Sequence, residues 1–147
     1  MTRTAVLLFH VFAWTSMLTG VVYGVMRYWP IPEDSMELVA HPSQPHVQHA
    51  HILLSAALTL LLGYVAGCHA VPYALGKGRV RRRSGWTLLA TAAPMVLSGF
   101  ALQTSTGEFA RSAWSAAHIA TSLVWSAGLV IHLALARRPW NRRTQAD

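Results

Sequence analysis

The chain has 147 residues, of which 53% are hydrophobic and 12% are charged, and its formal net charge is +7 at pH 7. This composition excludes an ordinary soluble domain and predicts an integral membrane protein. The positive charge does not indicate a nucleic-acid partner, because the Lys and Arg residues stand in short runs beside apolar segments, where membrane topology explains them. The single Cys68 excludes an internal disulfide and a C-x-x-C-H haem attachment site.

Four apolar segments follow one another along the chain, and each is long enough to cross a bilayer as a helix. We expect these spans at Thr4 to Met26, Val47 to Val71, Trp86 to Leu102 and Trp114 to Leu135. The first has no small-residue cleavage motif, so we interpret it as an uncleaved span and not as a signal peptide. Pro42 and Pro45 mark the start of the second span. Pro94, inside the third, predicts a kink and not a break.

The positions of Lys and Arg predict the orientation of these spans. With the N-terminus inside, only Arg27 and Arg111 lie outside. The ten inner residues are Arg3, Lys77, Arg79, Arg81, Arg82, Arg83, Arg137, Arg138, Arg142 and Arg143. We therefore predict an all-α integral membrane four-helix bundle, with residues 1–147 as a single four-span domain and both termini cytoplasmic. The longest polar stretch, about Trp29 to Gln48, is expected to be a loop.

The last span carries two histidines, His118 and His132, and no other ionisable group. Their separation of fourteen residues corresponds to about 21 Å along a helix and about 40° around it, so both are expected on one face. In a hydrocarbon layer of roughly 30 Å, one imidazole then lies near each surface. A histidine inside a membrane requires a partner for its ring nitrogens, which protein, water or a cofactor must supply.

Histidines in the other spans match these two depths. We expect His51 near the outer surface with His118, and His10 and His69 near the inner surface with His132. The sequence Ala-His-Ile-Leu-Leu-Ser at residues 50–55 also resembles Ala-His-Ile-Ala-Thr-Ser at 117–122. Two histidines that meet at one depth across a bundle provide the ligands for a bis-imidazole haem. The glycines of the spans either admit a porphyrin or allow close helix packing.

These histidines resemble the pattern of the di-haem cytochrome b membrane subunits of bacterial respiratory dehydrogenases. That cytochrome b561-like family includes the gamma subunits of formate dehydrogenase and the cytochrome b subunits of nickel-iron hydrogenase. The resemblance implies a multi-pass protein of a bacterial inner membrane. It also implies two non-covalent haem b groups, because family members hold them with one His on helix one, one on helix two and two on helix four. It implies that His51 and His118 ligate the outer haem iron, and that His10 and His132 ligate the inner one.

Two histidines offer alternatives to this assignment. His49 and His51 point about 160° apart on a helix, so only one of them can be the ligand. The similarity of residues 50–55 to residues 117–122 favours His51, which matches His118. His69 shares a face with His51, because eighteen residues make five whole α-helical turns, and it competes with His10 for the inner site. The unused inner histidine is then expected to hydrogen-bond a haem propionate or a quinone.

A different class of function is transition-metal binding or transport. Four histidines, namely His41, His46, His49 and His51, crowd the expected outer loop and could bind copper, nickel or zinc. Against this hypothesis, no Asp, Glu or Lys lies inside the spans to provide a cation pathway. A membrane hydrolase or desaturase would require more histidines and carboxylates close together.

The sequence thus predicts electron transfer across the membrane through two b-type haems, between an outer, periplasmic redox partner and membrane quinone. No G-x-G-x-x-G motif for a flavin or nucleotide is present, which favours quinone or quinol as the mobile substrate. We expect a quinone-reactive subunit of an oxidoreductase complex, whose partners are membrane lipid and a separate periplasmic or membrane redox subunit. The acidic stretch from Pro30 to His46 is the expected docking surface for that subunit.

Overall fold

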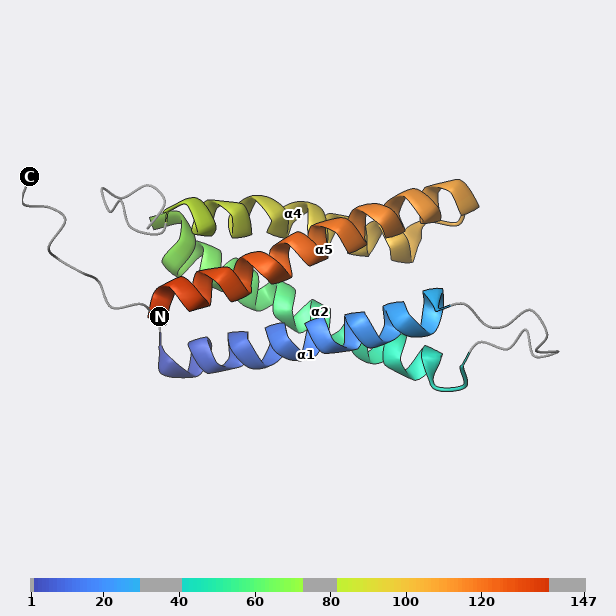
Figure 1. Cartoon of the computed structure of the whole chain (residues 1–147), viewed down its shortest axis with the longest axis horizontal. Coiled ribbons are helices and arrows are strands. Elements are labelled where there is room, and N and C mark those ends of the chain that lie inside the picture. Colours follow the sequence, from blue (N-terminus) through green and yellow to red (C-terminus); the bar gives the residue numbers. More distant parts are fainter. Residues whose placement is uncertain (1, 30–40, 73–81, 138–147) are drawn as a thin grey trace, which may run out of the picture. The chain divides into compact units, whose positions relative to one another are not determined.

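The computed structural model describes residues 2–29, 41–72 and 82–137, and it is helical in all three ranges (Figure 1). The elements are α1 (Arg3–Tyr28), α2 (Gln44–Val65), the π-helix η1 (Ala66–Ala70), α4 (Arg82–Thr104) and α5 (Glu108–Arg137). No strand occurs in these ranges, which confirms the all-α class. Four helical segments are long and apolar enough to cross a membrane, as the sequence predicted, and the second of them includes η1.

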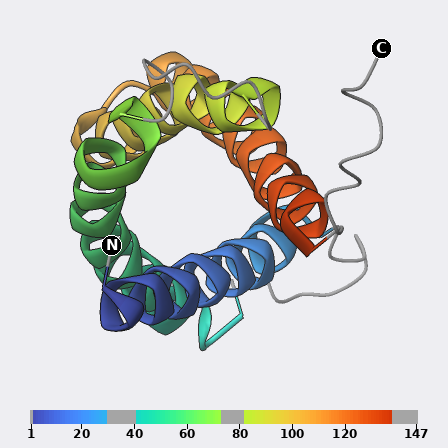
Figure 2. The ribbon, with the colours of Figure 1, turned by 90° about the vertical axis from the view of Figure 1, so that its left-hand side faces the viewer.

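The chain divides into two compact units, Met1–His69 and Ala70–Asp147. In the first unit α1 packs against α2, and in the second unit α4 packs against α5. Figure 2 looks along the helices and shows that the two members of each pair cross instead of running parallel. Each unit is therefore a helical hairpin with its own interhelical contact, whereas the single four-span domain stays a prediction.

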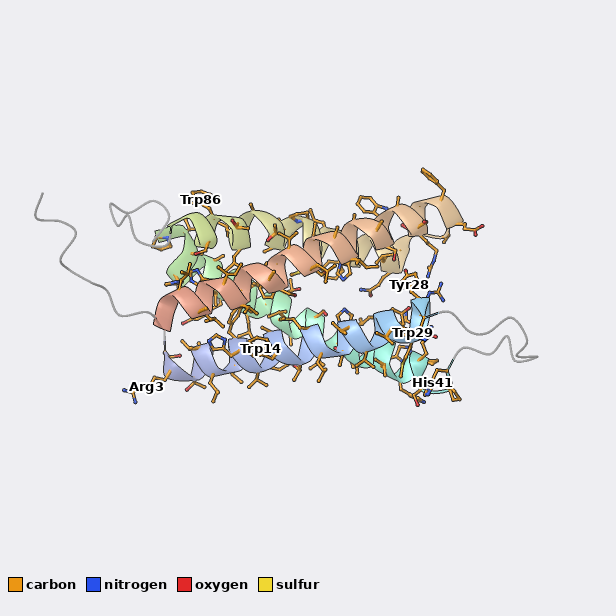
Figure 3. All side chains as sticks on the ribbon, in the orientation of Figure 1. Arg3, Trp14, Tyr28, Trp29, His41 and Trp86 are labelled. Atoms are coloured by element: carbon orange, nitrogen blue, oxygen red, sulfur yellow. The ribbon has the colours of Figure 1, made fainter. Side chains whose placement is uncertain are left out.

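The first hairpin has well-defined helix starts. Thr2 caps α1, because its Oγ1 accepts a hydrogen bond of 3.2 Å from the backbone N–H of Ala5. A proline, Pro45, stands at the start of α2, where its missing N–H costs no helical hydrogen bond. In Figure 3, Tyr28, Trp29 and His41 lie at one end of this hairpin and Arg3 lies at the other.

The start of α2 corrects the extent of the predicted outer loop. The loop was expected to continue to Gln48, but α2 begins at Gln44. His46 therefore lies on α2 together with His49 and His51, and the assignment of these three histidines to the outer loop was wrong. The acidic residues Glu33, Asp34 and Glu37 lie outside the described residues.

The second hairpin is joined by a short connection. Arg111 donates a hydrogen bond of 3.3 Å from Nη1 to the carbonyl of Ser105, just after the end of α4. This places a positive charge at the carbonyl end of the helix, where the helix dipole favours it. Pro94 lies inside α4 and the helix continues through it, so the predicted absence of a break is confirmed. Trp114, expected at the start of the last span, lies inside α5, which begins at Glu108.

The outer surface of the helices is apolar. Leu7, Leu60 and Leu123 have 63%, 78% and 62% of their surface exposed, whereas Ala13 and Leu58 of the first hairpin are buried. Large aliphatic side chains exposed in such numbers are rare on soluble proteins, and lipid tails solvate them without loss. Trp86, labelled in Figure 3, is half-exposed near the start of α4, as expected for an interfacial aromatic. The helices are thus suited to contact with membrane lipid.

Candidate histidine sites

His51 of α2 is hydrogen-bonded to α1 through one ring nitrogen. Its Nδ1 lies 3.1 Å from the carbonyl oxygen of Ser16 and 3.2 Å from the Oγ1 of Thr19. The Thr19 hydroxyl itself lies within hydrogen-bond distance of the carbonyls of residues 15 and 16, at 2.9 and 3.1 Å, so its proton is directed along α1. Both groups at Nδ1 are then acceptors, and this network assigns the proton of His51 to Nδ1.

His118 of α5 makes the same contacts with α4. Its Nδ1 lies 3.0 Å from the carbonyl oxygen of Met95 and 3.3 Å from the Oγ of Ser98. Ser98 is 2% exposed, and its hydroxyl lies 2.6 Å from the carbonyl of Pro94 and 3.0 Å from that of Met95. The ring proton of His118 is therefore also assigned to Nδ1. In both residues Nε2 carries the lone pair, which is the form in which imidazole ligates a metal.

His132 contacts the same helix as His118, nearer the start of α4. Its Nδ1 lies 3.0 Å from the Oγ of Ser84. Ser84 precedes Ser98 by fourteen residues, and His118 precedes His132 by the same number. Because α4 and α5 run in opposite directions along the hairpin, equal spacings bring each serine to its own histidine. The second hairpin therefore holds two serine–histidine contacts, separated by about 21 Å along the helix.

His10 of α1 differs from the other three predicted ligands. Its Nδ1 is buried and has no hydrogen-bond partner among the described residues. The ring of Phe9 packs edge-on against the His10 ring, with the ring centroids 5.7 Å apart. A buried ring nitrogen without a hydrogen bond costs about 1–3 kcal/mol, so a partner from elsewhere would stabilise it.

The remaining histidines are exposed. His49 lies on α2 but is exposed, so His51 is the one of this pair that contacts α1. His69 is exposed within η1. His41 accepts a hydrogen bond of 3.2 Å from the backbone N–H of Ser43. Across residues 2–29, 41–72 and 82–137, no group of three or more His, Cys, Asp or Glu side chains is placed to hold a metal ion.

The two predicted ligand pairs each combine the two hairpins. His10 and His51 belong to the first unit, and His118 and His132 belong to the second. His51, His118 and His132 each have a hydrogen-bond partner within their own unit. The pairing of His51 with His118 and of His10 with His132 stays a prediction.

Sequence reasoning missed the hydroxyl groups that contact the histidines. Thr19, Ser84 and Ser98 were not singled out, although each precedes a glycine in an apolar segment. A Ser/Thr–Gly dipeptide in a membrane span combines a small polar group with open space beside it. That signal, repeated three times in the described helices, could have identified the three positions.

Together the fold and these contacts define a class: a helical protein with four candidate membrane spans and histidines hydrogen-bonded between paired helices. Comparison of the chain with protein-family models, with curated proteins and with solved structures gives no match in any of the three.

Proposed function

We propose that the protein transfers electrons across a bacterial inner membrane through two non-covalent b-type haems. His51 and His118 would ligate the outer haem, and His10 and His132 would ligate the inner haem. The observation that carries this proposal is the shared state of His51 and His118. Each is inside a candidate membrane span, and each directs Nδ1–H at a backbone carbonyl, at 3.1 and 3.0 Å.

This state fits an axial ligand of haem iron. Iron binds a neutral imidazole through its unprotonated nitrogen, and ligating histidines usually donate the other N–H to a carbonyl or carboxylate, which fixes the ring and makes the ligand more basic. Bound haem would supply an iron that gains and loses one electron, which the imidazole side chains themselves cannot do. The alternative is a purely structural role, in which each histidine only links two helices by a hydrogen bond. It explains one hydrogen-bonded ring more easily than the same arrangement in both hairpins.

The spacing of the histidines supports transfer across the membrane. His118 and His132 lie on one helix, about 21 Å apart along its axis, so two haems held there would connect the two surfaces. Quinone or quinol is the proposed mobile substrate, and a separate periplasmic or membrane redox subunit is the proposed partner. The excess of Lys and Arg in the segments assigned to the inside supports cytoplasmic termini.

A direct test is the haem content of the purified protein. We expect two haems per chain in a pyridine haemochrome assay, all extractable because no thioether attaches them, with a low-spin spectrum in both oxidation states. A preparation that binds no haem in haem-replete cells would refute the proposal. Copper, nickel or zinc bound in a near-stoichiometric amount to such a preparation would instead favour the metal-binding alternative.

A further inference from the structure

The first helix of each hairpin presents the same three groups to the histidine of the second helix. On α1 these are the carbonyl of Ser16, the hydroxyl of Thr19 and Gly20, which has no Cβ atom to obstruct the ring. On α4 they are the carbonyl of Met95, the hydroxyl of Ser98 and Gly99, which likewise has no Cβ atom there. We call each set a histidine seat. In both seats the hydroxyl is three residues and the glycine four residues after the carbonyl.

We propose that the seats are positioning elements: Thr19 with Gly20, and Ser98 with Gly99, fix the ring tautomer and orientation of His51 and His118. The role of the ring in haem ligation rests on the proposed function. The fixed tautomer does not, because it follows from contacts within each hairpin.

Glycine is required in the seat because of how side chains cover a helix. A side chain leans toward the N-terminus of its helix, so the residue at i+4 covers the carbonyl of residue i. That carbonyl already accepts the backbone hydrogen bond of the residue at i+4, but its second lone pair can accept another donor. With glycine at i+4, an imidazole from the neighbouring helix reaches this lone pair. Gly20 and Gly99 stand at i+4 from Ser16 and Met95.

Among the described glycines, Gly20 and Gly99 are the two at which an added Cβ atom would meet a histidine ring. A Cβ atom at Gly20 would lie 2.9 Å from the Cε1 of His51, and one at Gly99 would lie 3.1 Å from the Cε1 of His118. A Cβ atom at Gly24 of α1 or at Gly85 of α4 would meet nothing within 4 Å. An added methyl group would therefore displace the imidazole at Gly20 and Gly99 but not at Gly24 and Gly85.

The hydroxyl has a separate role. Its proton is directed at a carbonyl of its own helix, so its oxygen is an acceptor for the ring N–H. The imidazole thus finds two acceptors at Nδ1. A donor would allow the other tautomer, in which Nδ1 accepts and Nε2 carries the proton.

The test uses the full chain, purified without haem from haem-deficient cells and labelled with 15N-histidine. Nitrogen chemical shifts distinguish the two tautomers, and His51→Asn and His118→Asn identify the signals. We expect Nδ1–H for both residues. Gly20→Ala should shift the tautomer ratio of His51 toward Nε2–H by roughly tenfold, the value of one hydrogen bond, and Gly99→Ala should do so for His118.

The matched controls are Gly24→Ala on α1 and Gly85→Ala on α4. Each adds the same methyl group to the same helix, so any general effect of alanine on the helix is equal. A shift in the controls as large as in the seat variants would overturn the proposal. Nε2–H as the main tautomer in the unsubstituted protein would also overturn it.

The hydroxyl variants provide the second measurement if an alanine in a seat prevents folding. Thr19→Val and Ser98→Ala keep the carbonyl acceptor and remove the hydroxyl, so they should shift the ratio in the same direction but less. Thr19→Ser and Ser98→Thr should retain the original ratio. An unchanged ratio in Thr19→Val and Ser98→Ala would refute a positioning role for the hydroxyls.

Haem content measured on matched haem-replete preparations separates this inference from the proposed function. Fixed Nδ1–H tautomers in a protein that never binds haem would refute the proposed function and leave the seats in place. Two haems in a protein whose apo form has Nε2–H at His51 and His118 would refute the seats alone.

Discussion

At the scale of single residues, the contrast between His51 and His49 gives the sharpest prediction. His51 contacts two acceptors on α1, whereas His49 is exposed on the same helix. If the proposed haems are bound, His51→Ala should reduce the haem content from two per chain to about one, because the outer iron would lose a protein ligand. His49→Ala should leave both haems in place. The pyridine haemochrome assay measures both.

A purely structural role for His51 would also make His51→Ala more harmful than a change at the exposed His49. The control for shared ligation is therefore His118→Ala. If the two residues ligate one iron, His51→Ala and His118→Ala should remove the same haem, with the same reduction midpoint missing from a redox titration. Loss of different haems, or loss of haem in His49→Ala, would contradict the assignment.

At the scale of elements, η1 changes the comparison between His69 and His10. The face shared by His51 and His69 required eighteen residues of uninterrupted α-helix, but α2 ends at Val65 and a π-helix follows. A π-helix has more residues per turn, so side chains beyond its start fall behind the α-helical register. His69, which is exposed in η1, is therefore displaced from the predicted face.

This displacement favours His10 as the inner ligand. His10→Ala should leave the inner haem absent or high-spin, because the iron retains only His132. His69→Ala should keep that haem low-spin and at most change its reduction potential, as expected for a neighbour that is not a ligand. Visible and electron paramagnetic resonance spectra measure spin state and occupancy. A low-spin, fully occupied inner haem in His10→Ala, together with its loss in His69→Ala, would reverse the assignment.

The elements also show what sequence could predict and why. Hydropathy identified all four candidate spans, because a membrane span must be apolar over about twenty residues whatever its partners are. It did not locate the start of α2, where Gln44 and Pro45 begin a helix in a polar sequence.

The histidine seats were missed for a different reason. A backbone carbonyl has no signature in the sequence. Whether a histidine can reach it depends on a glycine on one helix and on the histidine's position on another helix. The histidine follows the carbonyl residue by 35 positions in the first hairpin and by 23 in the second.

At the scale of the whole molecule, the two hairpins repeat one construction with a difference. Each has a seat on its first helix and a histidine from an Ala-His-Ile sequence on its second. In the second hairpin the additional predicted ligand, His132, lies on the same helix as His118 and contacts Ser84 of α4. In the first hairpin the additional predicted ligand, His10, is on the first helix instead. A repeat of two spans preserves direction, so α1 and α4 would cross the membrane the same way.

This common direction makes a testable prediction about topology. If the positive-inside rule holds here, Thr2 faces the cytoplasm and the connection between α4 and α5 faces the outside. Thr106, next to Gly107 in that connection, is exposed. In a Cys68→Ser background, Thr106→Cys should react with a membrane-impermeant maleimide in right-side-out vesicles. Thr2→Cys should react only after the vesicles are permeabilised.

The same measurement bears on the proposed electron path. With α5 entering from the outside, His118 lies ten residues into the helix from its outer end at Glu108, and His132 lies five residues from its inner end at Arg137. Labelling of Thr106→Cys only after permeabilisation, together with free labelling of Thr2→Cys, would reverse both depths. The haem of His51 and His118 would then lie near the cytoplasm, and a periplasmic donor would have to reduce the other haem first.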